Sequence, residues 1–368
     1  MLQRDATFAP EGRRAVATGG AKRNPWIYCA SSDLAPKERR IRRDVAAFQR
    51  GSANLAMICL VVGTALSTTG CSRHSVGLYE VKWLDNIEYS NNGPASSLAL
   101  DIALPRGLKG PKPLVVWIHG GGWVIGSRKL MRPLCEFTTS LGYVSATISY
   151  RLARSDVKFP LPVHDVTEAV QFLRKNARKY RIDPEKIVIG GESAGGHLAL
   201  MVGLCDDPEI VGAEPLARLN SPIRGIVNIY APTELTSLYE SSGIIAPAVI
   251  RRLLGCKPDE CPETYAAASP VTYLRPTSPP ILVLHGNWDS IVPYQQSEAL
   301  IDACRKSGAP VEMGAVRHAE HAWVARPRAA TAISTLPLTA HFLGRVFAGN
   351  GSEIVTQPNP NRTDAPVP

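Results

Sequence analysis

One short stretch limits the possible folds of this chain more than any other: residues 186–201 read KIVIGGESAGGHLALM. A strand-like apolar run leads into Gly191-Glu192-Ser193-Ala194-Gly195, and a helix-like apolar run follows. Glycines are costly inside regular elements, so four of them around one serine indicate a special backbone geometry. A strand, a tight turn and a helix would expose the serine hydroxyl above a sheet, as in a nucleophile elbow. The alternative is a glycine-rich loop without a chemical role.

The rest of the chain predicts an α/β fold. Apolar, β-branched runs are expected to form strands at 114–118, 144–150, 186–189, 224–230, 279–285 and 311–316, with helices at 164–180 and 294–308. Such alternation is typical of a mostly parallel central sheet with helices on both faces. Alternation of apolar and polar residues within 77–105 predicts that the domain begins with antiparallel strands. Residues 232–265 break the pattern, so we expect a small cap there, over the carboxyl edge of the sheet.

The N-terminal part has the pattern of a targeting segment. A basic stretch at 38–50 precedes an apolar run at 55–66 and small residues that lead to Cys71. This run is short for a membrane span but suits the core of a signal peptide. Gly70-Cys71 resembles the end of a bacterial lipoprotein signal. We therefore expect export to the periplasm, cell envelope or medium, with membrane attachment through a lipidated Cys71; a plain secretory signal and an uncleaved anchor are the alternatives.

Composition divides the chain into a leader at 1–71, one catalytic domain at 72–348 and a polar, disordered tail at 349–368. The net charge is +9, but residues 1–54 contribute +6 of it, so we expect no basic face for a nucleic-acid partner.

The eight cysteines form no C-x-x-C pair and no zinc spacing with histidine, and no metal is expected. Cys256 and Cys261 either close a small disulfide loop or are two separate thiols.

A second glycine motif, WIHGGGW at 117–123, also follows an apolar strand. Consecutive glycines leave their backbone N–H groups free to donate to a developing oxyanion. The N–H groups of Gly121, Gly122 and Ala194 are therefore the candidate oxyanion hole. A phosphate-binding loop is the alternative, but the spacing matches neither G-x-G-x-x-G nor a Walker motif.

A serine nucleophile needs a base, and the base needs an orienting acid, in the chain order Ser, Asp or Glu, His. Asp289 follows the strand at 279–285 and is the candidate acid. His318 and His321 both follow the strand at 311–316, and spacing alone leaves either as the base.

These motifs together resemble the α/β-hydrolase esterases of the HGGG class. Within that class, the chain is most similar to the bacterial feruloyl/acetyl-xylan esterase-type (BD-FAE-like) group and to hormone-sensitive-lipase-like relatives. The resemblance covers about 77–347 and is carried by PLVVWIHGGGW, GGESAGGHLAL, ASPVTYL, HGNWDSIVP and EHAW.

The resemblance implies a role for each matching residue. Ser193 would be the nucleophile and Asp289 the acid, and His321 would be the base because the family's histidine precedes a small residue and an aromatic. Glu234 stands in PTEL, where the family has PTDL, and we expect it to be structural.

The implied activity is that of a serine carboxylic-ester hydrolase that cleaves short acetyl- or feruloyl-type esters through an acyl-enzyme. The partner would be a small-molecule ester, and no cofactor is implied. An amidase or arylformamidase on the same fold and a non-catalytic binding protein are the alternatives.

Several aromatic and histidine side chains adjoin these motifs. Trp123 and Trp288 are candidate substrate-pocket residues, with buried packing as the alternative. His119 is expected to organise the glycine loop and His197 to pack within its helix. His164 and Asp165 are expected to cap the helix at 164–180.

Overall fold

The computed structural model describes residues 79–90, 98–107, 109–212, 215–216, 223–316, 318–323 and 330–349. The predicted leader with Cys71 lies outside the described residues, as does the predicted tail apart from Gly349. Across the described ranges, no helix is both long enough and apolar enough to span a membrane.

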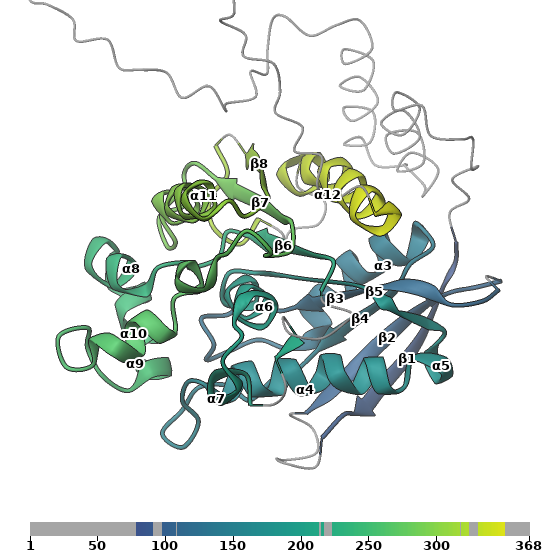
Figure 1. Cartoon of the computed structure of the whole chain (residues 1–368), viewed down its shortest axis with the longest axis horizontal. Coiled ribbons are helices and arrows are strands. Elements are labelled where there is room, and N and C mark those ends of the chain that lie inside the picture. Colours follow the sequence, from purple (N-terminus) through teal and green to yellow (C-terminus); the bar gives the residue numbers. More distant parts are fainter. Residues whose placement is uncertain are drawn as a thin grey trace, which may run out of the picture.

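An eight-stranded sheet forms the centre of the domain, in the order β1-β2-β4-β3-β5-β6-β7-β8 (Figure 1). The strands are β1 (Val81–Glu88), β2 (Ala99–Pro105), β3 (Lys112–Ile118), β4 (Val144–Ile148), β5 (Ile182–Glu192), β6 (Gly225–Ile229), β7 (Ile281–Gly286) and β8 (Val311–Val316). Strand β2 pairs antiparallel with β1 and β4, and all other pairs are parallel. The predicted antiparallel opening and mostly parallel sheet are therefore confirmed.

Helices cover both faces of the sheet (Figure 1). They are η1 (Arg128–Met131), α3 (Arg132–Ser140), α4 (Leu161–Lys175), α5 (Ala177–Tyr180), α6 (Ala194–Leu204), α7 (Pro208–Val211), α8 (Leu235–Ser241), α9 (Ile245–Leu254), α10 (Pro262–Ala267), η3 (Pro270–Tyr273), α11 (Gln295–Ser307) and α12 (Ala330–Ala348). Successive side chains of a strand point to opposite faces, so β3 sends Val116 towards the core beneath α4 and α6, and Trp117 towards the core beneath α3 and α12.

The helix predicted at 164–180 differs from the structure in its bounds and in the role of its first residues. It begins at Leu161, with a proline in its first turn, and is interrupted at Asn176. Asp165 therefore lies inside α4, fully buried, where it accepts hydrogen bonds from the backbone and side chain of Arg151. The prediction that His164 and Asp165 cap the helix is wrong; His164 instead bonds the backbone oxygen of Glu209.

The segment predicted as a cap, residues 232–265, folds into α8, α9 and the start of α10. Glu234 accepts hydrogen bonds from the first backbone N–H groups of α8, which fits the expected structural role. Cys256 and Cys261, between α9 and α10, are joined in a disulfide, so the disulfide alternative is the one that the structure contains.

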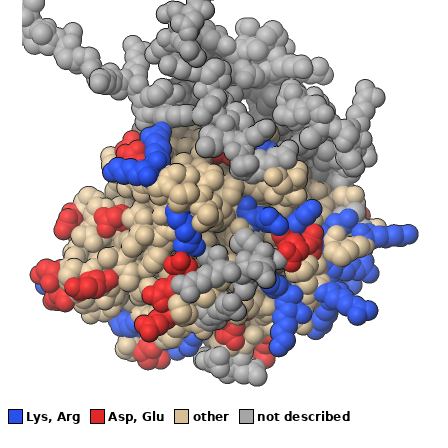
Figure 2. Space-filling view, viewed as in Figure 1, with Lys and Arg blue, Asp and Glu red and all other residues tan. Residues whose placement is uncertain are grey.

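Charged side chains are unevenly spread over the face shown in Figure 2. Acidic side chains gather towards the side that carries α9 and α10, and basic side chains towards the side that carries α5. Neither sign of charge covers the whole face.

Candidate active site

Ser193 occupies the turn between β5 and α6 in an unusual backbone conformation. Its φ is 50° and its ψ is −123°, values that residues with a side chain rarely adopt. The Ser193 N–H donates to the carbonyl of Ile229 on β6 at 2.8 Å, and the Ser193 carbonyl accepts from His197 of α6 at 3.0 Å. The neighbouring strand and helix therefore hold the turn in place.

Two glycines make this turn sterically possible. A Cβ atom on Gly195 would lie 2.1 Å from the carbonyl oxygen of Ile118, at the end of β3. A Cβ atom on Gly191 would lie 2.5 Å from the backbone carbon of Gly195. Backbone thus packs directly on backbone beneath Ser193, which explains the glycines of the motif.

The structure brings Ser193, His321 and Asp289 together. His321 Nε2 lies 2.9 Å from Ser193 Oγ, and Nδ1 of the same ring lies 2.6 Å from Asp289 Oδ2. His318 lies apart from this group: its N–H donates to Asn287, and its ring lies 4.4 Å from that of Trp288. Of the two histidines left open by spacing, His321 is the one placed beside the serine.

Asp289 is buried and tightly bonded. Its Oδ1 accepts from the N–H groups of Ile291 and Val292 at 3.0 and 2.9 Å, while Oδ2 faces His321 and, at 3.3 Å, His285 Nε2. Burial alone would raise the pKa of Asp289, but the hydrogen bonds from His285, His321 and Val292 outweigh it and lower the pKa to about 2. The carboxylate is therefore ionised at neutral pH.

His285, which the sequence reasoning missed, is the second histidine at this carboxylate. It is fully buried at the end of β7, with Nδ1 2.6 Å from Ser297 Oγ and Nε2 2.9 Å from the Val292 carbonyl. The sequence did contain a signal that could have identified it: a histidine ends an otherwise apolar strand, four positions before the candidate acid.

The glycine loop after β3 lies directly against the serine. A Cβ atom on Gly120 would lie 3.1 Å from Ser193 Cβ. Gly121 and Gly122 have φ values of 109° and 57°, and the Gly121 carbonyl accepts from Val124 and Ile125, so the loop turns sharply here. Gly121 and Gly122 follow the glycine that contacts Ser193, and Ala194 is the first residue of α6.

His119 and Tyr150 pack together at the start of this loop. Their rings stack with centroids 4.5 Å apart, and the Tyr150 hydroxyl donates to the His119 carbonyl at 3.0 Å. Burial lowers the pKa of His119 to about 4, against the opposing effect of its hydrogen bond to Gly120, so the ring is neutral at pH 7. This arrangement agrees with the expected organising role.

The two candidate pocket tryptophans lie in different environments. Trp123 is only 1% exposed, and its Nε1 donates to His197 Nδ1 at 3.2 Å. His197 in turn bonds the Ala268 carbonyl at 2.8 Å, which agrees with its expected packing role. The burial of Trp123 favours its packing alternative. Trp288 is 58% exposed and accessible to a ligand.

A buried carboxylate beside the nucleophile was also missed. Glu192 is 6% exposed and accepts a hydrogen bond from the hydroxyl of Tyr230, whose ring centroid lies 4.8 Å from that of His321. Burial raises the pKa of Glu192, although the Tyr230 hydrogen bond, the charge of His321 and the Gly120 N–H oppose this.

Comparisons with known proteins show which sequences and structures this chain resembles. The BD-FAE family model matches residues 100–304. The probable carboxylic ester hydrolase LipM of Mycobacterium tuberculosis is 28% identical over 267 residues, which cover 72% of this chain and 61% of LipM. Esterase LipQ of the same organism is 30% identical over 240 residues, 64% of this chain and 56% of LipQ. The chain thus spans about three-fifths of the length of these curated relatives.

A solved structure shares the fold. The propionate-bound esterase 2 of Thermogutta terrifontis superposes with a TM-score of 0.58 at 27% identity, covering 76% of this chain and 97% of that one. The sheet order, the helices on both faces and this likeness confirm the predicted α/β-hydrolase fold.

Proposed function

Because the chain belongs to the BD-FAE family, we propose that it is a carboxylic-ester hydrolase with Ser193 as its nucleophile. The observation that carries the proposal is the continuous hydrogen-bonded chain from Ser193 through His321 to Asp289, with distances of 2.9 and 2.6 Å. A base within hydrogen-bond reach of the hydroxyl, itself oriented by a carboxylate, is the arrangement that activates serine.

Each group has one task in the proposed reaction. His321 Nε2 takes the proton of Ser193 Oγ as the oxygen attacks the ester carbonyl, and Asp289 holds the imidazole and stabilises its positive charge. The N–H groups of Gly121, Gly122 and Ala194 stabilise the oxyanion. The imidazolium then protonates the departing alcohol, which leaves an acyl-enzyme.

Hydrolysis of the acyl-enzyme reverses these roles. His321 takes a proton from a water molecule that attacks the acyl carbon, and then returns it to Ser193 as the acid leaves.

The proposed substrates are esters of short acyl groups, of acetyl or feruloyl type. Helix α9 supports this choice because it limits the space above the glycine loop after β3, which we call the oxyanion loop for the proposed role of its N–H groups. A Cβ atom on Gly122 would lie 3.1 Å from a methyl group of Val249. The Thermogutta esterase, which shares the fold, was solved with propionate, a short-chain carboxylate, bound.

A fluorophosphonate probe and a panel of esters test the activity. The probe should label the wild-type protein but not Ser193→Ala, which separates an activated serine from a non-catalytic binding protein. The kcat/KM for p-nitrophenyl esters should fall from butyryl to decanoyl. Faster cleavage of the matching anilides would instead support an amidase, and a rise towards decanoyl would refute the short-acyl proposal.

For the leader we propose export with lipidation of Cys71, which rests on the sequence pattern alone. Protein made in a bacterial host should begin at Cys71 and carry an acyl addition by intact mass, and Cys71→Ser should release it from membranes. A mature cytosolic protein that retains residues 1–50 would contradict export.

A further inference from the structure

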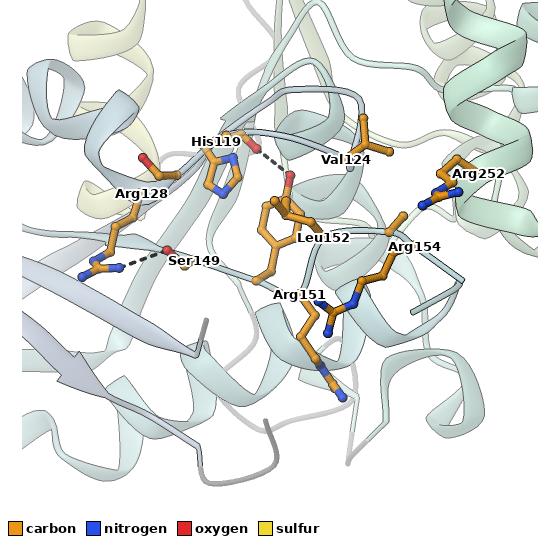
Figure 3. A pocket seen from close by; sticks show the side chains of 12 residues that line it. His119, Val124, Arg128, Ser149, Arg151, Leu152, Arg154 and Arg252 are labelled. Carbon is orange, nitrogen blue, oxygen red and sulfur yellow. Dashed lines mark hydrogen bonds between the residues drawn. The ribbon is translucent and has the colours of Figure 1, made fainter. Parts of the chain in front are cut away.

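A cavity of about 560 Å³ lies beside the oxyanion loop, next to the chain that follows β4 (Figure 3). Four arginines from three separate segments line it, and no acidic side chain is among its described lining residues. These arginines are Arg128 of η1, Arg151 and Arg154 of the segment after β4, and Arg252 of α9. A wall with one sign of charge focuses the field within a cavity.

Two of these arginines are held by aspartates that do not line the cavity. Arg128 bonds Asp101 at 2.8 Å and Arg151 bonds Asp165 at 2.5 Å, and both aspartate side chains are almost completely buried. The guanidiniums of Arg128 and Arg151 are therefore each paired with a buried carboxylate. His119, also in the lining, adds no charge because its ring is neutral at pH 7.

The other two arginines, Arg154 and Arg252, have guanidinium N–H groups available to bind a ligand. Arg154 bonds Asp156 at 3.0 Å, but both side chains are more than half exposed, so this ion pair is weak. Arg252 makes no ion pair with any residue that the structure describes. Figure 3 shows Arg154 and Arg252 on the same side of the cavity, opposite Arg128.

Helix α9 connects the cavity with the candidate active site. Residues three apart lie on one face of a helix, so Val249 and Arg252 point to the same side of α9. Val249 packs against Gly122 of the oxyanion loop, and Arg252 reaches the cavity one turn further on, beside Val124 and Gly126. A ligand in the cavity would therefore extend along the helix from the oxyanion loop.

We propose that this cavity binds an anionic group, a carboxylate or phosphate, between Arg154 and Arg252. The planar guanidinium binds both oxyacids through two parallel N–H donors, which suits this lining. If the anion is a substituent of the ester's alcohol half, the inference rests on the proposed function and deepens it. If the anion is a free ligand, the site is independent of catalysis.

Binding is measured first in the Ser193→Ala protein, which cannot turn the ester over. By calorimetry, 4-acetoxybenzoate should bind about tenfold more tightly than its methyl ester, and inorganic phosphate should bind and compete. Arg252→Ala and Arg154→Ala should each reduce the affinity for 4-acetoxybenzoate about tenfold. Arg251→Ala is the matched control, because it removes the same charge from the neighbouring position of α9, which does not line the cavity.

Kinetics with the wild-type serine then identify the source of the anion. A kcat/KM preference for 4-acetoxybenzoate over its methyl ester, lost in Arg252→Ala, assigns the anion to the substrate. Phosphate binding without that preference assigns the site to a free anion. No binding of either anion, or an equal loss in Arg251→Ala, would overturn the proposal. If neither ester is turned over, the proposed function fails while the binding result stands.

Discussion

The hydroxyl of Tyr230 donates a hydrogen bond to the buried carboxylate of Glu192, the residue immediately before the candidate nucleophile. The Tyr230 ring also packs against His321, and the Gly120 N–H bonds the same carboxylate. One buried acidic group thus contacts the start of the oxyanion loop and supports the ring that underlies the candidate base. An attraction between the charges of Glu192 and His321 opposes the effect of burial on the pKa of Glu192.

Glu192→Gln is expected to lower kcat about tenfold, because the imidazolium formed during the reaction loses a nearby negative charge. Glu185→Gln, the same change at an exposed position of β5, is the control. A kcat equal to that of wild type would limit Glu192 to a packing role.

His321→Ala should reduce kcat by about 10³-fold or more, because it removes the group that we propose as the general base, while His318→Ala should retain most activity. Circular dichroism of both variants would show that the fold is kept. An inactive His318→Ala together with an active His321→Ala would reverse the assignment.

Asp289 should make stability pH-dependent at the acidic end. Its pKa is about 2 in the folded protein, below the ordinary 3.8, so its contribution is complete above pH 4 and is lost as the pH falls towards 2. The shift corresponds to about 2 kcal/mol. Urea unfolding of wild type and Asp289→Asn should therefore give free energies whose difference shrinks as the pH falls from 5 to 2; a constant difference would contradict a depressed pKa.

Gly195→Ala should destabilise the protein strongly, by about 3 kcal/mol or more, because its methyl group would meet the Ile118 carbonyl in a packed backbone contact. Gly344→Ala in α12 meets nothing within 4 Å and should be neutral or stabilising by up to about 1 kcal/mol. Thermal unfolding measures both. A Gly195→Ala protein as stable as wild type would show that the turn is looser than described.

Val249→Ala should widen the space above Gly122 and favour longer acyl chains. We expect the ratio of hexanoyl to acetyl kcat/KM to rise roughly tenfold, the scale of a few methyl-sized contacts in an apolar pocket. Ile244→Ala, at a 90% exposed position beside the start of α9, should leave the ratio unchanged. An equal ratio in wild type and Val249→Ala would show that α9 does not control the preferred acyl length.

The parts that the sequence predicted are those encoded locally. The strand, the glycine-flanked Ser193 and the apolar helix are contiguous, and the short strands carry their own apolar pattern. The strand order brings Asp289 near Ser193 because each follows a parallel strand of one sheet. His321 was separable from His318 only through the family resemblance.

The parts that the sequence did not predict depend on contacts between distant segments. The Glu192–Tyr230 hydrogen bond joins the ends of β5 and β6, and it depends on their register. Asp165 was predicted to cap a helix because its actual partner, Arg151, lies in another segment and could not be identified from the local sequence. The arginine-lined cavity combines η1, the chain after β4 and α9, and no sequence period links them.

Helix α6 carries a consequence for biosynthesis. All of its residues are buried, so it has no polar face, and its cover includes β6 and η3, which lie later in the chain. His197 finds its acceptor only at Ala268. Until that part of the chain leaves the ribosome, the apolar segment directly after Ser193 stays uncovered in the nascent polypeptide. A holding chaperone would then compete with the later segments for binding to it.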